Sequence, residues 1–236
     1  DAYKSLDEAL THGGIKNNVK INLIRIESDY LKLSEVKKKL VGVNGILIPG
    51  GFGKRGTEGK IAAISYARKN KIPFLGICFG MQMAVIEFAR NVLKIKKASS
   101  TEISKQCIPI VGLIDEWSKN GKVQKGTSKK LGGTMRLGLY PARLKESSLI
   151  KKIYKSRNIN ERHRHRYEVN INYQKKFEEK GMSFSGISPD NKLPEAIEIK
   201  KHPWFIAVQF HPEFKSRPLL PHPLFSSFIA AAKKNK

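Results

Sequence analysis

A cysteine between two glycines is the residue of this sequence best placed to do chemistry. Residues 76–80 read Gly-Ile-Cys-Phe-Gly, and Cys78 stands between an apolar run at 72–77 and a helical pattern at 81–93. A strand, a tight turn and a helix in this order are typical of a nucleophile elbow, in which the two glycines avoid a clash around strained backbone. The N-terminus of the following helix would stabilise a thiolate. A buried core cysteine is the alternative, because cysteine is among the most buried residue types.

A candidate base with its own carboxylate follows the last strand pattern. His211-Pro212-Glu213 comes directly after the apolar run at 204–210, at the edge where a parallel sheet gathers an active site. Because Pro212 favours an extended residue before it, His211 and Glu213 can lie on one side of the chain. His211 would take the thiol proton and later give it to the leaving group, while Glu213 would orient the imidazole. A surface turn is the alternative interpretation of this tripeptide.

A glycine-rich loop is expected to complete the site. Residues 49–53 read Pro-Gly-Gly-Phe-Gly and follow a short apolar strand at 46–48. The backbone N–H groups of Gly51 and Phe79 are our candidates for an oxyanion hole. An ordinary turn is the alternative, and the spacing fits neither a Walker A loop nor Gly-x-Gly-x-x-Gly.

The elements that must position these residues alternate between strand and helix. Apolar runs predict strands, and amphipathic spacing predicts helices. The predicted strands lie at 19–26, 46–48, 72–77, 107–114, 166–171, 196–199 and 204–210, and the predicted helices lie at 5–12, 60–70, 81–93 and 223–234. Gly13-Gly14 is expected to end the first helix, and Lys119 to Lys130 reads as a polar loop. We therefore expect an α/β fold in one domain, residues 1–236, with a mostly parallel central sheet and helices on both faces.

Composition limits the classes of function. The 45 Lys and Arg residues against 20 Asp and Glu give a formal charge of +25, but the surplus is scattered and no nucleic-acid-binding motif accompanies it. Two cysteines, with no signal peptide and no apolar run long enough to span a bilayer, favour the cytoplasm. His163 and His165 lack partners at metal-ligand spacing, so we expect no structural metal.

The motifs together resemble a known family. Residues 76–82 with His211-Pro212-Glu213 resemble the class I, or triad, glutamine amidotransferases. Four further segments resemble the glutaminase domain of CTP synthases in particular, at 49–60, 133–138, 162–170 and 209–218. The resemblance covers nearly the whole chain.

The resemblance implies hydrolysis of L-glutamine through a Cys78 thioester, with Cys78, His211 and Glu213 as the triad. The ammonia would pass to a synthetase domain that aminates UTP to CTP with ATP and Mg²⁺, in a homo-oligomer that is expected to be a tetramer. The glutamine-binding positions that it implies are Gly51, Phe52, Phe79, Gly80, Met81, Gln82, Glu102 and Arg166, and the positions for the activator GTP are Arg55, Gly56 and Glu58.

Two rival functions and one expectation about the chain's extent remain. Another Cys-His-Glu hydrolase, acting on peptides or γ-glutamyl compounds, fits the same residues, and a basic nucleic-acid-binding module fits the charge. Membrane partners are not expected. The family has a strand and a turn before the segment that resembles Asp1 to Ser5, so we expect that the first strand and the synthetase domain are absent from this chain.

Overall fold

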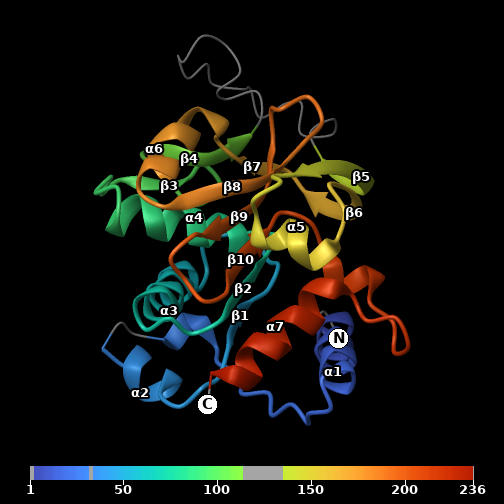
Figure 1. The fold of residues 1–236 in the computed structure, drawn as a ribbon. Helices are drawn as coiled ribbons and strands as arrows, with labels where there is room; N and C mark the ends of the chain where they lie inside the picture. Colours follow the sequence, from blue (N-terminus) through green and yellow to red (C-terminus); the bar gives the residue numbers. More distant parts are fainter. Residues whose placement is uncertain (1–2, 32–33, 114–134, 236) are drawn as a thin grey trace.

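A mixed seven-stranded sheet forms the centre of the computed structural model, which describes residues 3–31, 34–113 and 135–235 (Figure 1). Its strand order is β1-β2-β10-β9-β8-β5-β6. The strands that pair in parallel are β1 (Ile46–Ile48), β2 (Phe74–Ile77) and β10 (Phe205–Val208). The antiparallel part continues through β9 (Pro194–Ile199), β8 (Met182–Ile187), β5 (Arg136–Leu144) and β6 (Asn158–His165).

The α/β class with helices on both faces is confirmed, whereas the expected parallel majority of strands is not found. Parallel pairing in this sheet is confined to the three strands that carry the predicted chemistry. A parallel neighbour needs a long crossover, which the helix between β1 and β2 supplies. Beyond residue 135 the connections are shorter, as in the turn at 188–193 between β8 and β9, and short connections favour antiparallel pairs.

A second, three-stranded sheet lies beside the first. It contains β3 (Ala98–Ser100), β4 (Ile108–Leu113) and β7 (Tyr167–Val169), in the order β3-β4-β7. Strand β6 ends at His165 and β7 begins at Tyr167. Arg166 is therefore the single residue between a strand of the main sheet and a strand of the second sheet.

Helices cover the two faces of the main sheet with separate hydrophobic cores. One core includes side chains of α2 (Val36–Leu40), α3 (Thr57–Lys69), α4 (Phe79–Asn91) and α6 (Gln174–Glu179). The other includes side chains of α1 (Lys4–Lys16), α5 (Leu149–Tyr154) and α7 (Pro223–Lys234). Figure 1 shows α3 on one side of β1 and β2 and α7 on the other. In β2, Phe74 belongs to the first core and Leu75 to the second, as alternation along a strand requires.

Three short 3-10 helices complete the described secondary structure. They are η1 (Ser28–Tyr30), η4 (Ile171–Tyr173) and η5 (Pro212–Lys215). The last of them holds Glu213 and begins directly after His211.

The first two elements differ from their predictions. Helix α1 continues through Gly13 and Gly14 to Lys16. A Cβ atom at Gly13 would lie 2.9 Å from the Phe225 backbone oxygen of α7, so this glycine permits close helix packing instead of ending the helix. Residues 19–26 form no strand, because no neighbouring strand in the described structure pairs with them.

The remaining predicted elements are recovered with shifted ends. Helix α7 has the bounds expected at 223–234, whereas α3 and α4 begin earlier than 60 and 81. The predicted loop at 119–130 lies outside the described residues. No described helix has both the length and the apolar character needed to cross a bilayer.

Candidate active site

The backbone at Cys78 has the strained form expected of an elbow. Cys78 caps the N-terminus of α4 with φ 51° and ψ −103°, a region that non-glycine residues rarely adopt. Its N–H donates to the Val208 carbonyl at 2.7 Å, which fixes the elbow to the end of β10. The thiol is free and its residue is buried. Backbone geometry therefore fixes where the sulfur projects.

The two flanking glycines are required by close contacts. A Cβ at Gly76 would lie 2.8 Å from the Ala207 Cβ, and a Cβ at Gly80 would clash with the Ile48 backbone oxygen. The steric reason for both glycines that the elbow motif predicts is thus present in the fold.

His211 and Glu213 form a short hydrogen-bonded pair. Nδ1 of His211 lies 2.7 Å from Oε1 of Glu213. The His211 backbone N–H donates to the Arg162 carbonyl of β6 at 2.8 Å, and the Phe214 ring stacks on the imidazole with centroids 5.1 Å apart. These contacts hold the ring from its backbone, its face and its Nδ1 edge.

Gly50 is the point where the imidazole meets the cysteine. A Cβ on Gly50 would lie 2.8 Å from Cε1 of His211 and 3.7 Å from Cβ of Cys78. The loop after β1, the elbow after β2 and the segment after β10 therefore converge on one place, the ends of the three parallel strands. Gly50 was not predicted as a site residue, because its contribution is the space left by an absent side chain.

The electrostatics of His211 favour its protonated form. Burial alone lowers the pKa of His211, but the neighbouring Cys78 sulfur and the Glu213 carboxylate outweigh burial and raise it to about 10. Nε2 of His211 is buried and forms no hydrogen bond of ordinary geometry with the described residues. Cys78 is one of the two groups that raise the pKa of this ring, and Nδ1 already faces Glu213, so Nε2 is the nitrogen placed for proton transfer.

Gly51 and Phe79, the two residues predicted to supply the oxyanion donors, lie near each other. A Cβ on Gly51 would lie 3.8 Å from Cδ1 of Phe79. Phe79 is the first residue of α4, where helix geometry leaves backbone N–H groups without an intrahelical acceptor. Phe52, from the same loop as Gly51, has an 87% exposed side chain.

Glu102 is tied to the same loop. Its Oε1 accepts from the Gly53 N–H at 2.8 Å. Burial raises the pKa of Glu102 more than this hydrogen bond lowers it. Arg166 is half-buried at the junction of β6 and β7.

Two buried glutamine side chains connect the start of β7 to the sulfur of Cys78. Nε2 of Gln82 donates to the Tyr167 carbonyl at 2.9 Å and to Oε1 of Gln209 at 3.3 Å. Nε2 of Gln209 lies 3.8 Å from Sγ of Cys78. Gln209 was missed as a site residue, since only its place two residues before His211 could have signalled it. The Met81 side chain lies in the hydrophobic core, so only its backbone can face a substrate.

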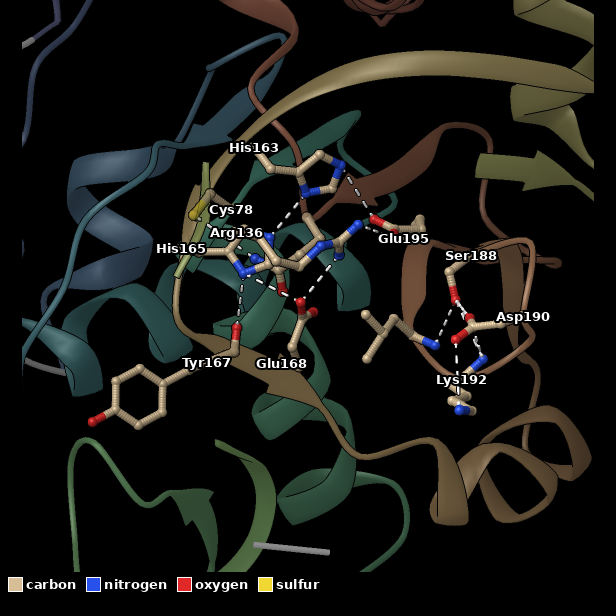
Figure 2. Close-up of polar contacts among 12 residues, drawn as sticks. Cys78, Arg136, His163, His165, Tyr167, Glu168, Ser188, Asp190, Lys192 and Glu195 are labelled. Carbon is tan, nitrogen blue, oxygen red and sulfur yellow. Dashed lines mark hydrogen bonds and ion pairs between the residues drawn. The ribbon is translucent and has the colours of Figure 1, made fainter. Parts of the chain in front are cut away.

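A buried ionic cluster lies at the β6–β7 junction, where His165 ends β6 and Glu168 lies in β7 (Figure 2). Arg136 donates to Oε1 of Glu168 at 3.0 Å and to Oε1 of Glu195 at 2.8 Å. Nδ1 of His163 lies 2.9 Å from Nε2 of His165. We call Arg136, His163, His165, Glu168 and Glu195 the arginine cluster; it joins β5, β6, β7 and β9 across the two sheets.

The arginine cluster holds its positive charge on the guanidinium. Burial lowers the pKa of His163 to about 2 and that of His165 to about 3, and Arg136 acts in the same direction. Burial raises the pKa of Glu168 to about 8 against the opposing charge of Arg136. Within the described residues no group of three or more His, Cys, Asp or Glu side chains is arranged to hold a metal ion.

The three positions expected to face GTP lie around the start of α3. Arg55 pairs with Asp29, and Glu58 accepts from Nη1 of Arg90 at 2.9 Å. Gly56 caps α3 with φ 68°, and a Cβ there would clash with Oγ of Ser28. Local structure thus already explains the glycine.

The family model for class-I glutamine amidotransferases matches residues 1–231. The fold and the elbow geometry agree with that match, and the chain belongs to the class-I glutamine amidotransferase family.

Individual relatives narrow the assignment of the chain within this family. A CTP synthase of Pelagibacter ubique (strain HTCC1062) is 73% identical over 236 residues, which cover 100% of this chain and 44% of that protein. A CTP synthase of Zymomonas mobilis subsp. mobilis is 56% identical over 237 residues, which cover 99% of this chain and 44% of that protein. Within its family, the chain groups with the glutaminase domains of CTP synthases. It spans less than half the length of these curated relatives.

Solved structures agree with this grouping. The glutaminase domain of Trypanosoma brucei CTPS with bound acivicin superposes with a TM-score of 0.89 at 38% identity, covering 100% of this chain and 89% of that chain. A putative GMP synthase protein from Thermoplasma acidophilum reaches a TM-score of 0.57 at 18% identity, covering 95% of this chain and 88% of that chain, and shows the shared fold alone.

Proposed function

We propose that this chain, as one amidotransferase domain, hydrolyses L-glutamine to glutamate and ammonia through a thioester on Cys78. The observation that carries the proposal is the convergence at Gly50, where a Cβ atom would lie 2.8 Å from the imidazole of His211 and 3.7 Å from Cβ of Cys78. The family to which the chain belongs names the substrate class. A strained nucleophile and a carboxylate-oriented base are the two parts that thioester chemistry needs.

The reaction follows from the positions of these groups. The Cys78 thiolate attacks the side-chain amide carbon of glutamine, and the N–H groups of Gly51 and Phe79 stabilise the negative oxygen of the tetrahedral intermediate. The protonated His211 gives its proton to the leaving nitrogen, so that ammonia departs and the thioester remains. A water molecule, deprotonated by His211, then attacks the thioester carbon and releases glutamate and the thiolate. Glu213 holds the ring and offsets its charge throughout.

The remaining predicted residues would bind the amino-acid end of glutamine. Arg166 suits the α-carboxylate, since a guanidinium can donate two parallel hydrogen bonds. Glu102 suits the α-ammonium, and its tie to Gly53 places it next to the oxyanion loop. The segment from Phe79 to Gln82, together with Gly51 and Phe52, would line the side-chain path.

The full-length relatives suggest the fate of the ammonia. We propose that it passes to a synthetase domain of the same polypeptide, which uses ATP and Mg²⁺ to aminate UTP to CTP in a cytoplasmic tetramer. GTP would activate glutamine hydrolysis at Arg55, Gly56 and Glu58. The names of the CTP synthase relatives and the chain's coverage of less than half their length support this part.

Covalent capture tests the glutaminase proposal. We would measure the intact mass of the protein after incubation with 6-diazo-5-oxo-norleucine, a glutamine mimic that alkylates amidotransferase cysteines. We expect one adduct on the wild type, none on Cys78→Ala, and protection by excess glutamine. Cys107→Ala is the matched control and should still be labelled.

The same measurement distinguishes an incomplete active site in the isolated chain from a failure of the glutaminase proposal. If the 236-residue chain is unlabelled but a longer protein that joins it to a synthetase domain is labelled, the added part completes the site. Absence of labelling on both would contradict the glutaminase proposal.

A further inference from the structure

We propose that Gln209 is a further catalytic residue, whose side-chain amide donates a hydrogen bond to the Cys78 sulfur and stabilises the thiolate. This inference rests on the proposed function, because it assigns a role to Gln209 in activating the same nucleophile. It is carried by a chain of hydrogen bonds that allows the Gln209 amide one orientation.

The orientation of the Gln82 amide is fixed by the Tyr167 carbonyl, which stands at the end of this series of hydrogen bonds and can only accept. The Tyr167 carbonyl faces the Gln82 side chain at 2.9 Å. Gln82 must therefore present its NH₂ group to that carbonyl, because its oxygen there would leave two acceptors facing each other. The second hydrogen of the same NH₂ group points to Gln209, 3.3 Å away.

The orientation of Gln82 in turn determines that of Gln209. Because Gln82 presents a donor, Gln209 must turn its Oε1 toward Gln82. Its NH₂ group is thereby directed to the other side, where Sγ of Cys78 lies 3.8 Å away. A flip of the Gln209 amide would break the contact to Gln82 and place an acceptor against the sulfur.

Gln209 has little freedom to leave this position. Its residue is fully buried, and Gln82 is 2% exposed. The Gln209 backbone N–H donates to the Glu195 carbonyl of β9 at 2.9 Å, and Glu195 in turn belongs to the arginine cluster. The backbone that carries Gln209 is thus pinned to the neighbouring strand.

A donor in this place would act on the thiolate more than on the thioester. A hydrogen bond to a charged acceptor is stronger than one to a neutral acceptor, and burial excludes the water that would otherwise solvate the sulfur. The amide therefore favours the thiolate before attack and again when the thioester breaks down. The alternative explanation is that Gln209 only fills space in the core. Substitution of Gln209 would then leave the ionisation of the Cys78 thiol unchanged, whereas loss of a donor would make ionisation harder.

Alkylation as a function of pH tests the proposal independently of glutamine hydrolysis. We would measure the rate of iodoacetamide addition to Cys78 by intact mass, in the 236-residue chain carrying Cys107→Ser, in which Cys78 is the one remaining cysteine. Gln209→Met keeps the length of the side chain but removes the donor. We expect its alkylation midpoint to move about one to two units toward higher pH, with at least a roughly tenfold lower rate below the wild-type midpoint. Glutaminase kcat should fall in parallel, while KM for glutamine changes little.

Two further variants keep the proposal falsifiable if Gln209→Met does not fold. Gln209→Glu places a carboxylate beside the sulfur and should move the midpoint further upward, and Gln209→Asn keeps the amide but withdraws it from the sulfur. An unchanged alkylation midpoint in any of these variants that melts cooperatively would overturn the proposal. Loss of labelling by the glutamine mimic in the wild type would instead count against the glutaminase function, so the two failures are distinguishable.

Discussion

Gly50 shows how an absent side chain can shape a site. A methyl group there would stand 2.8 Å from Cε1 of His211. Since the ring is held by Arg162, Glu213 and Phe214, it cannot move away without losing one of these contacts.

We predict that Gly50→Ala lowers glutaminase kcat by about 10- to 100-fold, because displacement of a reacting group by about 1 Å costs that much. The melting temperature should change little. Gly42→Ala is the matched control: Gly42 has φ 77° and open space around its Cβ position, so it strains only the backbone. Equal kcat values in the two variants would contradict the prediction.

His211 gives the site a distinctive pH dependence. Burial lowers the pKa of His211, and Cys78 and Glu213 together raise it to about 10. Activity should therefore persist to high pH and fall as His211 loses the proton that it must give to ammonia.

We predict that Glu213→Gln shifts the alkaline limb of kcat/KM to lower pH, because removal of the carboxylate removes one of the two groups that raise the pKa of His211. The pH profile of glutamine hydrolysis measures this limb in the free enzyme. Glu146→Gln changes an exposed carboxylate paired with Lys151 and should leave the limb in place. An unshifted limb in Glu213→Gln would mean that Glu213 does not hold the proton on His211.

Among single residues, those in local motifs could be read from the sequence and those that depend on distant contacts could not. The elbow glycines and the His-x-Glu pair lie within a few positions of each other, so spacing identifies them. Gln209 and Gly50 act on atoms of residues far away in the sequence, which no local pattern records.

At the scale of elements, the arginine cluster ties the junction of β6 and β7 to the rest of the sheet. Arg136 bridges Glu168 of β7 and Glu195 of β9. Arg166 is the single residue at this junction, so its position depends on how β7 is held.

We predict that Arg136→Met costs about 3–5 kcal/mol of unfolding free energy, because it leaves the buried carboxyl groups of Glu168 and Glu195 without their hydrogen-bond donor, and raises KM for glutamine by displacing Arg166. The matched control is Arg68→Met. Arg68 makes two hydrogen bonds to the buried Glu87, at 2.7 and 2.8 Å, between α3 and α4. We expect a comparable loss of stability there with an unchanged KM, as measured by urea unfolding and steady-state kinetics. A similar rise of KM in both variants would attribute the effect to general destabilisation.

Glu168 couples the arginine cluster to pH. Its pKa is raised by burial to about 8 in the folded state, against about 4.3 in an unfolded chain. The folded state therefore binds more protons between these values, so this group's stabilising contribution is complete below about pH 4.3 and is lost as pH rises to about 8.

We predict that Glu168→Gln, which keeps an acceptor for Arg136, flattens the decline of unfolding free energy between neutral pH and about pH 8. Urea unfolding at several pH values gives this slope for variant and wild type. Parallel slopes in the two proteins would show that Glu168 does not carry the proton.

The strand β5, which was not predicted from the sequence, shows why some elements escape pattern reading. It contains Gly138 and Pro141, two residues that argue against a strand interior. Its Leu137 and Leu139 are 64% and 59% exposed, so the apolar alternation does not mark the buried face. By contrast, β2 is buried throughout and reads as a continuous apolar run.

The whole molecule carries a charge that its site does not explain. Lysines such as Lys37, Lys38 and Lys39 lie exposed on α2, and the formal net charge is +25. Like charges on a compact body repel one another and lower its stability at low salt.

We predict that the melting temperature rises when the salt concentration increases from about 10 mM to about 150 mM, because the screening length falls from about 30 Å to about 8 Å. Parallel scans in NaCl and KCl separate screening from binding of one ion. A melting temperature that is constant or falls with salt would show that the surface charge is already balanced.

The pair of buried glutamine amides also offers a spectroscopic handle. Gln82 and Gln209 are almost wholly shielded from solvent, and both NH₂ protons of Gln82 and one of Gln209 are held in hydrogen bonds. In an ¹⁵N-labelled sample these protons should exchange slowly with deuterium and resonate apart from those of surface glutamines. Their signals would report directly, without any attached probe, when the sulfur changes from thiolate to thioester.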